Sequence, residues 1–112
     1  MKSKEKVIDN ICSLIILNIL SKQQVNTSFM FRNIFLNGLG IITDESYLIR
    51  ELEKQQFITH EGFFENSNFY KSLMITKKGQ EHYNEEMKCI EIPKGEFLEK
   101  REEMLKKYLG ID

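Results

Sequence analysis

Two short β-rich segments interrupt the otherwise helical pattern of this 112-residue chain. They read FITHEGFF and FYKSLMIT, and the polar residues 65–68 separate them. Strand-forming runs on both sides of a short polar turn predict a β-hairpin over residues 57–76. The aromatic residues beside the turn are expected to anchor this hairpin to a helical core. The chain is therefore expected to be mainly α-helical with one protruding hairpin.

Helical periodicity accounts for the segments on either side of the hairpin. The second helix is expected to begin at a cap formed by Thr27 or Ser28. By the same reasoning Thr43 is expected to cap the third helix and Thr76 the fourth. The helices are expected over residues 4–21, 28–37, 43–56, 77–90 and 95–109. A chain of this length is expected to form one domain, residues 1–112.

The first helix is apolar on nearly every side, as its segment ICSLIILNIL shows. Such a helix must be buried on two sides. The apolar stripe of the last helix could cover it within the same chain or form a seam with a second chain. The seam of a homodimer is favoured, because the first helix needs a second neighbour. The residues expected at this seam are Ile11, Ile15, Phe97, Leu98, Arg101, Met104, Leu105, Tyr108 and Leu109.

The charge of the chain is nearly balanced, with 16 basic and 17 acidic side chains and a net charge of −1. Nucleic-acid-binding domains are often strongly basic, so any DNA contact must come from local clustering. No apolar run reaches the roughly 20 residues of a membrane span, and no signal peptide is evident. Cys12 and Cys89 lack metal-binding spacing and are expected to be reduced thiols. A cytoplasmic protein is expected.

The sequence contains no recognisable catalytic or metal-binding pattern. His60 and His82 have no carboxylates or cysteines at ligand spacing around them. A Ser/His/Asp signature and a glycine-rich phosphate loop are also missing. We therefore expect no enzyme activity, no metal, no cofactor and no small-molecule ligand.

Two segments resemble the winged helix-turn-helix family, including PadR-like and MarR-like regulators. LGIITDESYLIRELEKQQFI, residues 39–58, resembles the turn and recognition helix of that family. YKSLMITKKGQEHYNEE, residues 70–86, resembles the second strand of the wing and the I-T-x-K-G entry to the next helix. The resemblance implies the order α-α-α-β-β-α plus a C-terminal helix, in which the hairpin is the wing. It also implies binding of double-stranded DNA.

The chain departs from the family pattern in two places. Gln56 stands where the family usually has glycine, at the turn into the first wing strand. Asp44 and Glu45 give an acidic character to the end of the third helix that normally enters the DNA groove, and phosphates repel acids.

The resemblance assigns DNA contact to two sets of polar residues. Short hydrogen-bonding side chains at the wing tip suit the minor groove, and flanking lysines suit phosphates. The wing is expected to contribute at least as much as the third helix. The wing set is His60, Asn66, Ser67, Asn68, Lys71, Lys77 and Lys78. The third-helix set is Thr43, Ser46, Tyr47, Arg50 and Lys54.

The resemblance thus implies a homodimeric, sequence-specific double-stranded DNA-binding protein. Its expected role is that of a transcriptional regulator, or of an accessory factor at a DNA site of a mobile element such as a plasmid transfer origin used in conjugation. The alternative is a winged-helix module for protein–protein interaction without a DNA target. The near-neutral charge and the acidic third helix favour that alternative.

Overall fold

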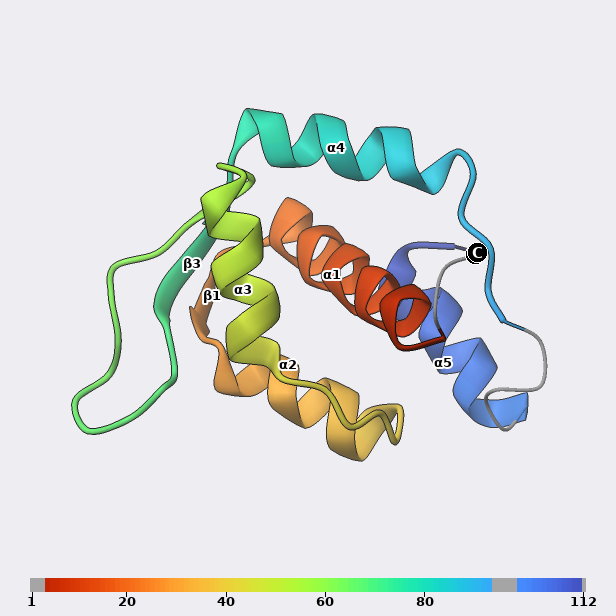
Figure 1. Cartoon of the computed structure of the whole chain (residues 1–112), viewed down its shortest axis with the longest axis horizontal. Coiled ribbons are helices and arrows are strands. Elements are labelled where there is room, and N and C mark those ends of the chain that lie inside the picture. Colours follow the sequence, from red (N-terminus) through yellow and green to blue (C-terminus); the bar gives the residue numbers. More distant parts are fainter. Residues whose placement is uncertain (1–3, 94–98, 112) are drawn as a thin grey trace.

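Helix α1 (Lys4–Lys22) lies at the centre of the computed structural model, which describes residues 4–93 and 99–111. Helix α4 (Lys77–Met87) runs above α1 and helix α5 (Glu99–Leu109) below it in Figure 1, and both contact it. Helix α3 (Glu45–Lys54) contacts it as well. Every residue from 11 to 20 except Ser13 is buried. The neighbours that an all-apolar helix requires are therefore supplied by its own chain.

Several residues of the seam expected from the sequence lie in the core of the single chain. Leu105 and Leu109 on α5 are fully buried against a core that includes Ile11 and Ile15. A side chain inside one chain leaves no surface for another, so α5 acts as intramolecular cover. Met104, Tyr108 and Arg101 stay partly exposed. Phe97 and Leu98 lie outside the described residues.

A three-stranded antiparallel sheet flanks the helices, in the order β1-β3-β2. Strand β3 (Lys71–Ile75) pairs with β2 (Ile58–Thr59) to form the base of the expected hairpin. On its other edge β3 pairs with β1 (Val25–Thr27), where Val25 lies opposite Leu73. The sequence did not predict β1, because a three-residue strand is too short to show alternation.

The expected second helix consists of two parts. Helix α2 (Phe29–Asn33) continues into a π-helical turn, η1 (Ile34–Gly38), in which the Leu39 amide donates to the Ile34 carbonyl at 3.0 Å. Ser28 precedes α2 but does not cap it with its side chain. Its Oγ instead accepts a hydrogen bond from the Tyr70 amide at 2.8 Å, which ties α2 to the wing.

Helix α3 is capped by Asp44, so the expectation of Thr43 as the cap is wrong. The Asp44 side chain accepts a hydrogen bond from the Tyr47 amide at 3.1 Å. The Thr43 hydroxyl donates to Asp9 on α1 at 3.0 Å instead. Both residue types cap helices well, and the bond of Thr43 to α1 joins residues 34 positions apart, so it is not visible in the local sequence. On α4, by contrast, the expected cap is confirmed, because Thr76 Oγ1 accepts from the Gly79 amide at 3.0 Å.

A buried polar cluster joins the three helices α1, α4 and α5. Asn18 on α1 is only 5% exposed, and its Nδ2 donates to the Tyr108 carbonyl at 2.7 Å. The Tyr83 hydroxyl on α4 lies 3.1 Å from Asn18 Oδ1 and 2.5 Å from the Leu109 carbonyl oxygen. Burial of Tyr83 raises the pKa of its hydroxyl. These bonds satisfy a polar side chain that would otherwise be costly in the apolar centre.

Gln56 ends helix α3 in a left-handed conformation, with φ of 66°. Its amide donates to the Glu53 carbonyl at 2.9 Å, and the Phe57 amide donates to the Leu52 carbonyl at 3.0 Å. This pair of bonds is the Schellman motif, which places glycine at the left-handed position. Because Gln56 has a Cβ atom, its left-handed conformation strains the backbone at the position where the family usually has glycine.

Replacing Gln56 with glycine is expected to stabilise the domain by about 0.5–1 kcal/mol. A left-handed residue with a Cβ costs about 1–2 kcal/mol, and the greater freedom of glycine in the unfolded chain offsets part of the gain. Urea unfolding of the variant would show a higher midpoint. Gln55→Gly is the matched control, because Gln55 has φ of −84° and no such strain to relieve. A midpoint for Gln56→Gly at or below that of the original chain would contradict the prediction.

Within the described residues, no helix has the length and hydropathy that crossing a bilayer requires. Both cysteines are free, Cys12 in the core and Cys89 exposed beyond the end of α4. Burial raises the pKa of the Cys12 thiol to about 12, so the thiol stays protonated.

Candidate nucleic-acid interface

The hairpin closes on the four polar residues that the sequence placed at its turn. An isolated bridge pairs Phe63 with Tyr70, and the Phe64 amide donates to the Phe69 carbonyl at 2.9 Å. Inside the turn Ser67 Oγ lies 3.2 Å from the Phe64 carbonyl oxygen, and it accepts from the Phe69 amide at 3.2 Å. Hydrogen bonds therefore close the tip into a turn.

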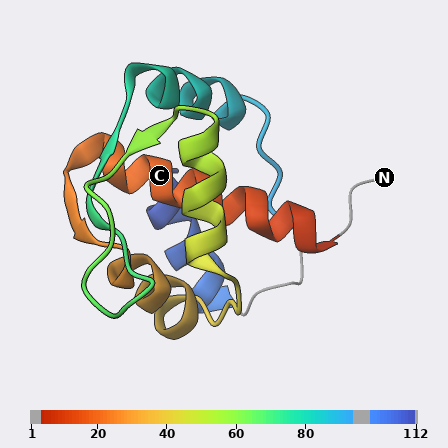
Figure 2. The same ribbon diagram turned by 60° about the vertical axis from the view of Figure 1, so that its left-hand side comes forward.

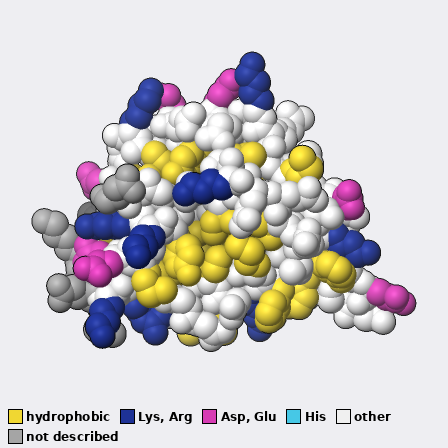
Figure 3. Space-filling model, turned by 180° about the vertical axis from the view of Figure 1, so that it is seen from behind, with side chains coloured by type: hydrophobic (Ala, Val, Ile, Leu, Met, Phe, Trp, Pro, Cys, Tyr) yellow, Lys and Arg dark blue, Asp and Glu magenta, His cyan; other side chains and the backbone are white. Residues whose placement is uncertain are grey.

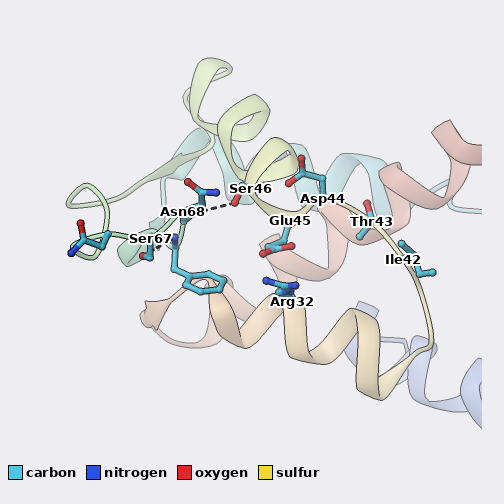
Figure 4. Close-up of a pocket in the computed structure, with 10 residues that line it drawn as sticks. Arg32, Ile42, Thr43, Asp44, Glu45, Ser46, Ser67 and Asn68 are labelled. Carbon is cyan, nitrogen blue, oxygen red and sulfur yellow. Dashed lines mark hydrogen bonds between the residues drawn. The ribbon is translucent and has the colours of Figure 1, made fainter.

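The wing tip lies beside the first turn of α3. The Ser46 hydroxyl on α3 donates to the Asn68 carbonyl at 3.1 Å (Figure 4). Figure 2 shows the wing, α2 and the beginning of α3 gathered at one end of the molecule. Between them is a groove of about 680 Å³. We call it the wing–helix groove, and its lining residues are Arg32, Ile42, Thr43, Asp44, Glu45, Ser46, Asn66, Ser67, Asn68 and Phe69.

The two acids at the start of α3 have local roles in the fold. Asp44 serves as the helix cap. Glu45 is 7% exposed, and in Figure 4 its carboxylate faces the guanidinium of Arg32 from α2. Of the two acids, Glu45 is therefore buried, and Asp44 is exposed at this end and caps the helix.

Five of the expected contact residues line the groove, namely Thr43, Ser46, Asn66, Ser67 and Asn68. Lys71 lies just beyond the tip, with its Nζ 5.3 Å from the Phe64 ring centroid. Tyr47 and Arg50 are exposed along α3, and the Arg50 guanidinium lies 5.8 Å from the Tyr47 ring centroid. The five lining residues thus share the groove, whereas Tyr47 lines a separate hollow with Asp9 and Asn10 of α1.

The other expected contact residues lie elsewhere. The side chain of His60 is only 13% exposed, and its Nε2 lies against the Glu53 carboxylate. Its Nδ1 accepts a hydrogen bond from the Gly62 amide at 2.9 Å. The His60 side chain therefore connects the wing to the end of α3. Lys54 pairs with Glu51 at 3.4 Å near the C-terminal end of α3.

Lys77 and Lys78 begin α4 at the end of β3 opposite the wing tip (Figure 1). Strand β3 separates these two lysines from the wing tip, and its five residues span roughly 16 Å of extended chain. Lys78 Nζ lies 5.7 Å from the ring centroid of Phe57. The distance from the tip separates both lysines from the wing–helix groove.

The sequence reasoning missed Arg32 and Ile42, which also line the groove. Arg32 is the basic residue on the outer face of α2, and that position was visible in the sequence. Ile42 is 92% exposed. Two isoleucines, Ile41 and Ile42, precede the Thr-Asp pair in the sequence. Nothing in the sequence shows that Ile41 is buried and Ile42 is exposed. Only the structure distinguishes the two.

The architecture defines a winged helix-turn-helix domain, as the sequence predicted: helices α1 to α3, the wing and then α4. The crystal structure of Bacillus subtilis PadR in complex with operator DNA shares this fold, with a TM-score of 0.54 and 22% sequence identity. The match covers 86% of this chain and 56% of the PadR chain, so this chain spans little more than half of that protein. No protein-family model and no curated protein matches the sequence.

Across residues 4–93 and 99–111, no group of three or more His, Cys, Asp or Glu side chains is placed to hold a metal ion.

Proposed function

We propose that this chain binds double-stranded DNA through the wing–helix groove and the exposed face of α3, and that it regulates transcription. The observation that carries the proposal is the hydrogen bond from Ser46 to the Asn68 carbonyl. It holds the wing tip against the end of α3 that a winged helix directs toward DNA. Two elements far apart in sequence then present one polar surface.

The side chains of this surface suit the parts of a duplex. Asn66 and Asn68 are exposed amides, which donate to and accept from base edges. Arg50 on α3 and Lys71 just beyond the wing tip supply positive charge that can neutralise phosphates. These two residues are the positive charge that a chain of net charge −1 would use to bind DNA at this end.

The likeness to PadR supports a DNA-binding regulator, because PadR was solved with operator DNA. It lends no support to the narrower role at a plasmid transfer origin. Homodimer formation remains part of the proposal. Among the described residues of the expected dimer interface, only Arg101, Met104 and Tyr108 are partly exposed and can contact a second chain. The other described residues of that set are buried.

The wing should carry much of the affinity for DNA. Duplexes selected by the purified protein from random sequence would be titrated by fluorescence anisotropy at several salt concentrations. Replacing residues 66–68 with glycine together with Lys71→Ala is expected to weaken binding about tenfold or more and to flatten the salt dependence by about one phosphate contact. Lys77→Ala is the control, because it removes the same charge at the far end of β3 and is expected to leave both quantities unchanged.

Failure to bind any duplex at low salt, selected or random, would reject the DNA proposal. Equal effects of the wing variant and Lys77→Ala would reject the groove as the contact surface.

A second candidate is the protein–protein interaction module. A band of apolar side chains crosses the face opposite to that of Figure 1 (Figure 3). The large exposed apolar residues of the molecule include Leu36 at 47% and Met104 at 37%. Exposed apolar surface often marks contact with another protein. This candidate becomes the leading one if no DNA is bound.

A further inference from the structure

The side chain of Ile42 is held in solvent beside the wing–helix groove. It is 92% exposed, the highest value among the large exposed apolar residues that the structure describes. A single exposed isoleucine is common on protein surfaces. This one differs from an ordinary surface residue in how firmly its backbone is fixed and in what surrounds it.

Both neighbours of Ile42 are fixed to the core. The Ile41 side chain is buried, and its amide donates to the Phe35 carbonyl at 2.7 Å. The Thr43 hydroxyl donates to Asp9 on α1 at 3.0 Å. Asp44 then caps α3. The chain is thus anchored on both sides of Ile42, and its exposed side chain lies next to the start of α3.

Polar residues dominate the rest of the groove lining. In the major groove of DNA, the exposed apolar group is the C5 methyl of thymine. An isoleucine beside the start of the helix directed toward DNA can make apolar contact with that methyl group, which cannot form a hydrogen bond.

We propose that Ile42 is a specificity-determining residue that contacts a thymine methyl group in the major groove, so that the recognised DNA has thymine at the position facing the start of α3. This inference rests on the proposed DNA binding. It concerns which base is read, whereas the proposed function concerns whether DNA is bound at all.

The test replaces each thymine of a selected duplex in turn with deoxyuridine, which pairs identically but lacks the methyl group. For the original protein we expect a loss of affinity of about fourfold at one or two positions, the equivalent of one buried methyl group. Ile42→Ala is expected to bind the thymine duplex about fourfold more weakly, with no further loss on the deoxyuridine duplex. Leu36→Ala is the matched control, exposed on η1 outside the groove lining, and it should keep the full sensitivity to deoxyuridine.

Tight DNA binding by the original protein with no sensitivity to deoxyuridine at any position would overturn this inference and leave the proposed function standing. Independent, additive losses from Ile42→Ala and from deoxyuridine would also overturn it, since the methyl group would then be contacted by another residue. An Ile42 side chain that wedges between base pairs from the minor groove would give a loss with Ile42→Ala but none with deoxyuridine, which again overturns it. Absence of all DNA binding would remove the proposed function and the inference together.

Discussion

Gly79→Ala is expected to destabilise the domain by about 3 kcal/mol or more, although alanine is the better helix former by about 1 kcal/mol. Gly79 lies in the first turn of α4 and packs against the backbone of Phe57, which follows α3. A Cβ at this position would lie 2.1 Å from the carbonyl oxygen of Phe57 and 2.9 Å from its carbonyl carbon. That carbonyl cannot easily withdraw, because it accepts a hydrogen bond from the Thr76 amide at 2.9 Å. Relief requires α4 to move away from the wing base.

Urea unfolding followed by circular dichroism measures this effect. Gly38→Ala is the matched control, because its added Cβ would meet nothing closer than the Tyr108 hydroxyl at 3.6 Å. We expect that variant to stay within about 1 kcal/mol of the original chain. If Gly79→Ala proved as stable as Gly38→Ala, the close approach of α4 to Phe57 would be refuted.

Leu105→Ala is expected to lower the free energy of unfolding by about 2–5 kcal/mol, the range for large-to-small changes in a packed core. Leu105 is fully buried between α5 and α1, so its loss leaves a cavity inside one chain. Met104 on the same helix is 37% exposed, and Met104→Ala should cost about 0.5 kcal/mol or less.

The dependence of the unfolding midpoint on protein concentration shows whether α5 covers α1 within one chain or forms part of a dimer interface. Unfolding midpoints of both variants would be measured at two protein concentrations that differ about fiftyfold. If α5 covers α1 within one chain, the deficit of Leu105→Ala is the same at both concentrations. A deficit that shrinks as protein concentration rises would instead assign Leu105 to an intersubunit contact, because mass action stabilises an oligomer.

Local signals in the sequence were sufficient for much of the fold. The four-residue polar turn of the wing and the Thr76 cap were both expected and are both present. Leu48, Ile49 and Leu52 stand at helical spacing in the sequence, and all three are buried on α3. Turns, caps and periodic stripes depend on residues a few positions apart, so their physical causes are visible in the chain itself.

The candidate site was only partly predictable. Polar residues at the wing tip and at the start of α3 were identified by type and by resemblance, and the structure brings five of them into one groove. The same reasoning included Lys77 and His60, which lie away from it. Residue type cannot reveal that a strand carries one lysine to the far end of the sheet, or that a histidine ring turns toward Glu53.

The sequence by itself determined a helical chain with one hairpin, a buried first helix and a polar wing tip. Only the tertiary structure decided which elements bury that helix, which of Thr43 and Asp44 caps α3, and that the wing tip is bonded to Ser46. The physical reason is distance along the chain. Contacts such as Ser46 with Asn68, or Asn18 with the Tyr108 carbonyl, join residues 22 and 90 positions apart, and no local pattern encodes such pairs.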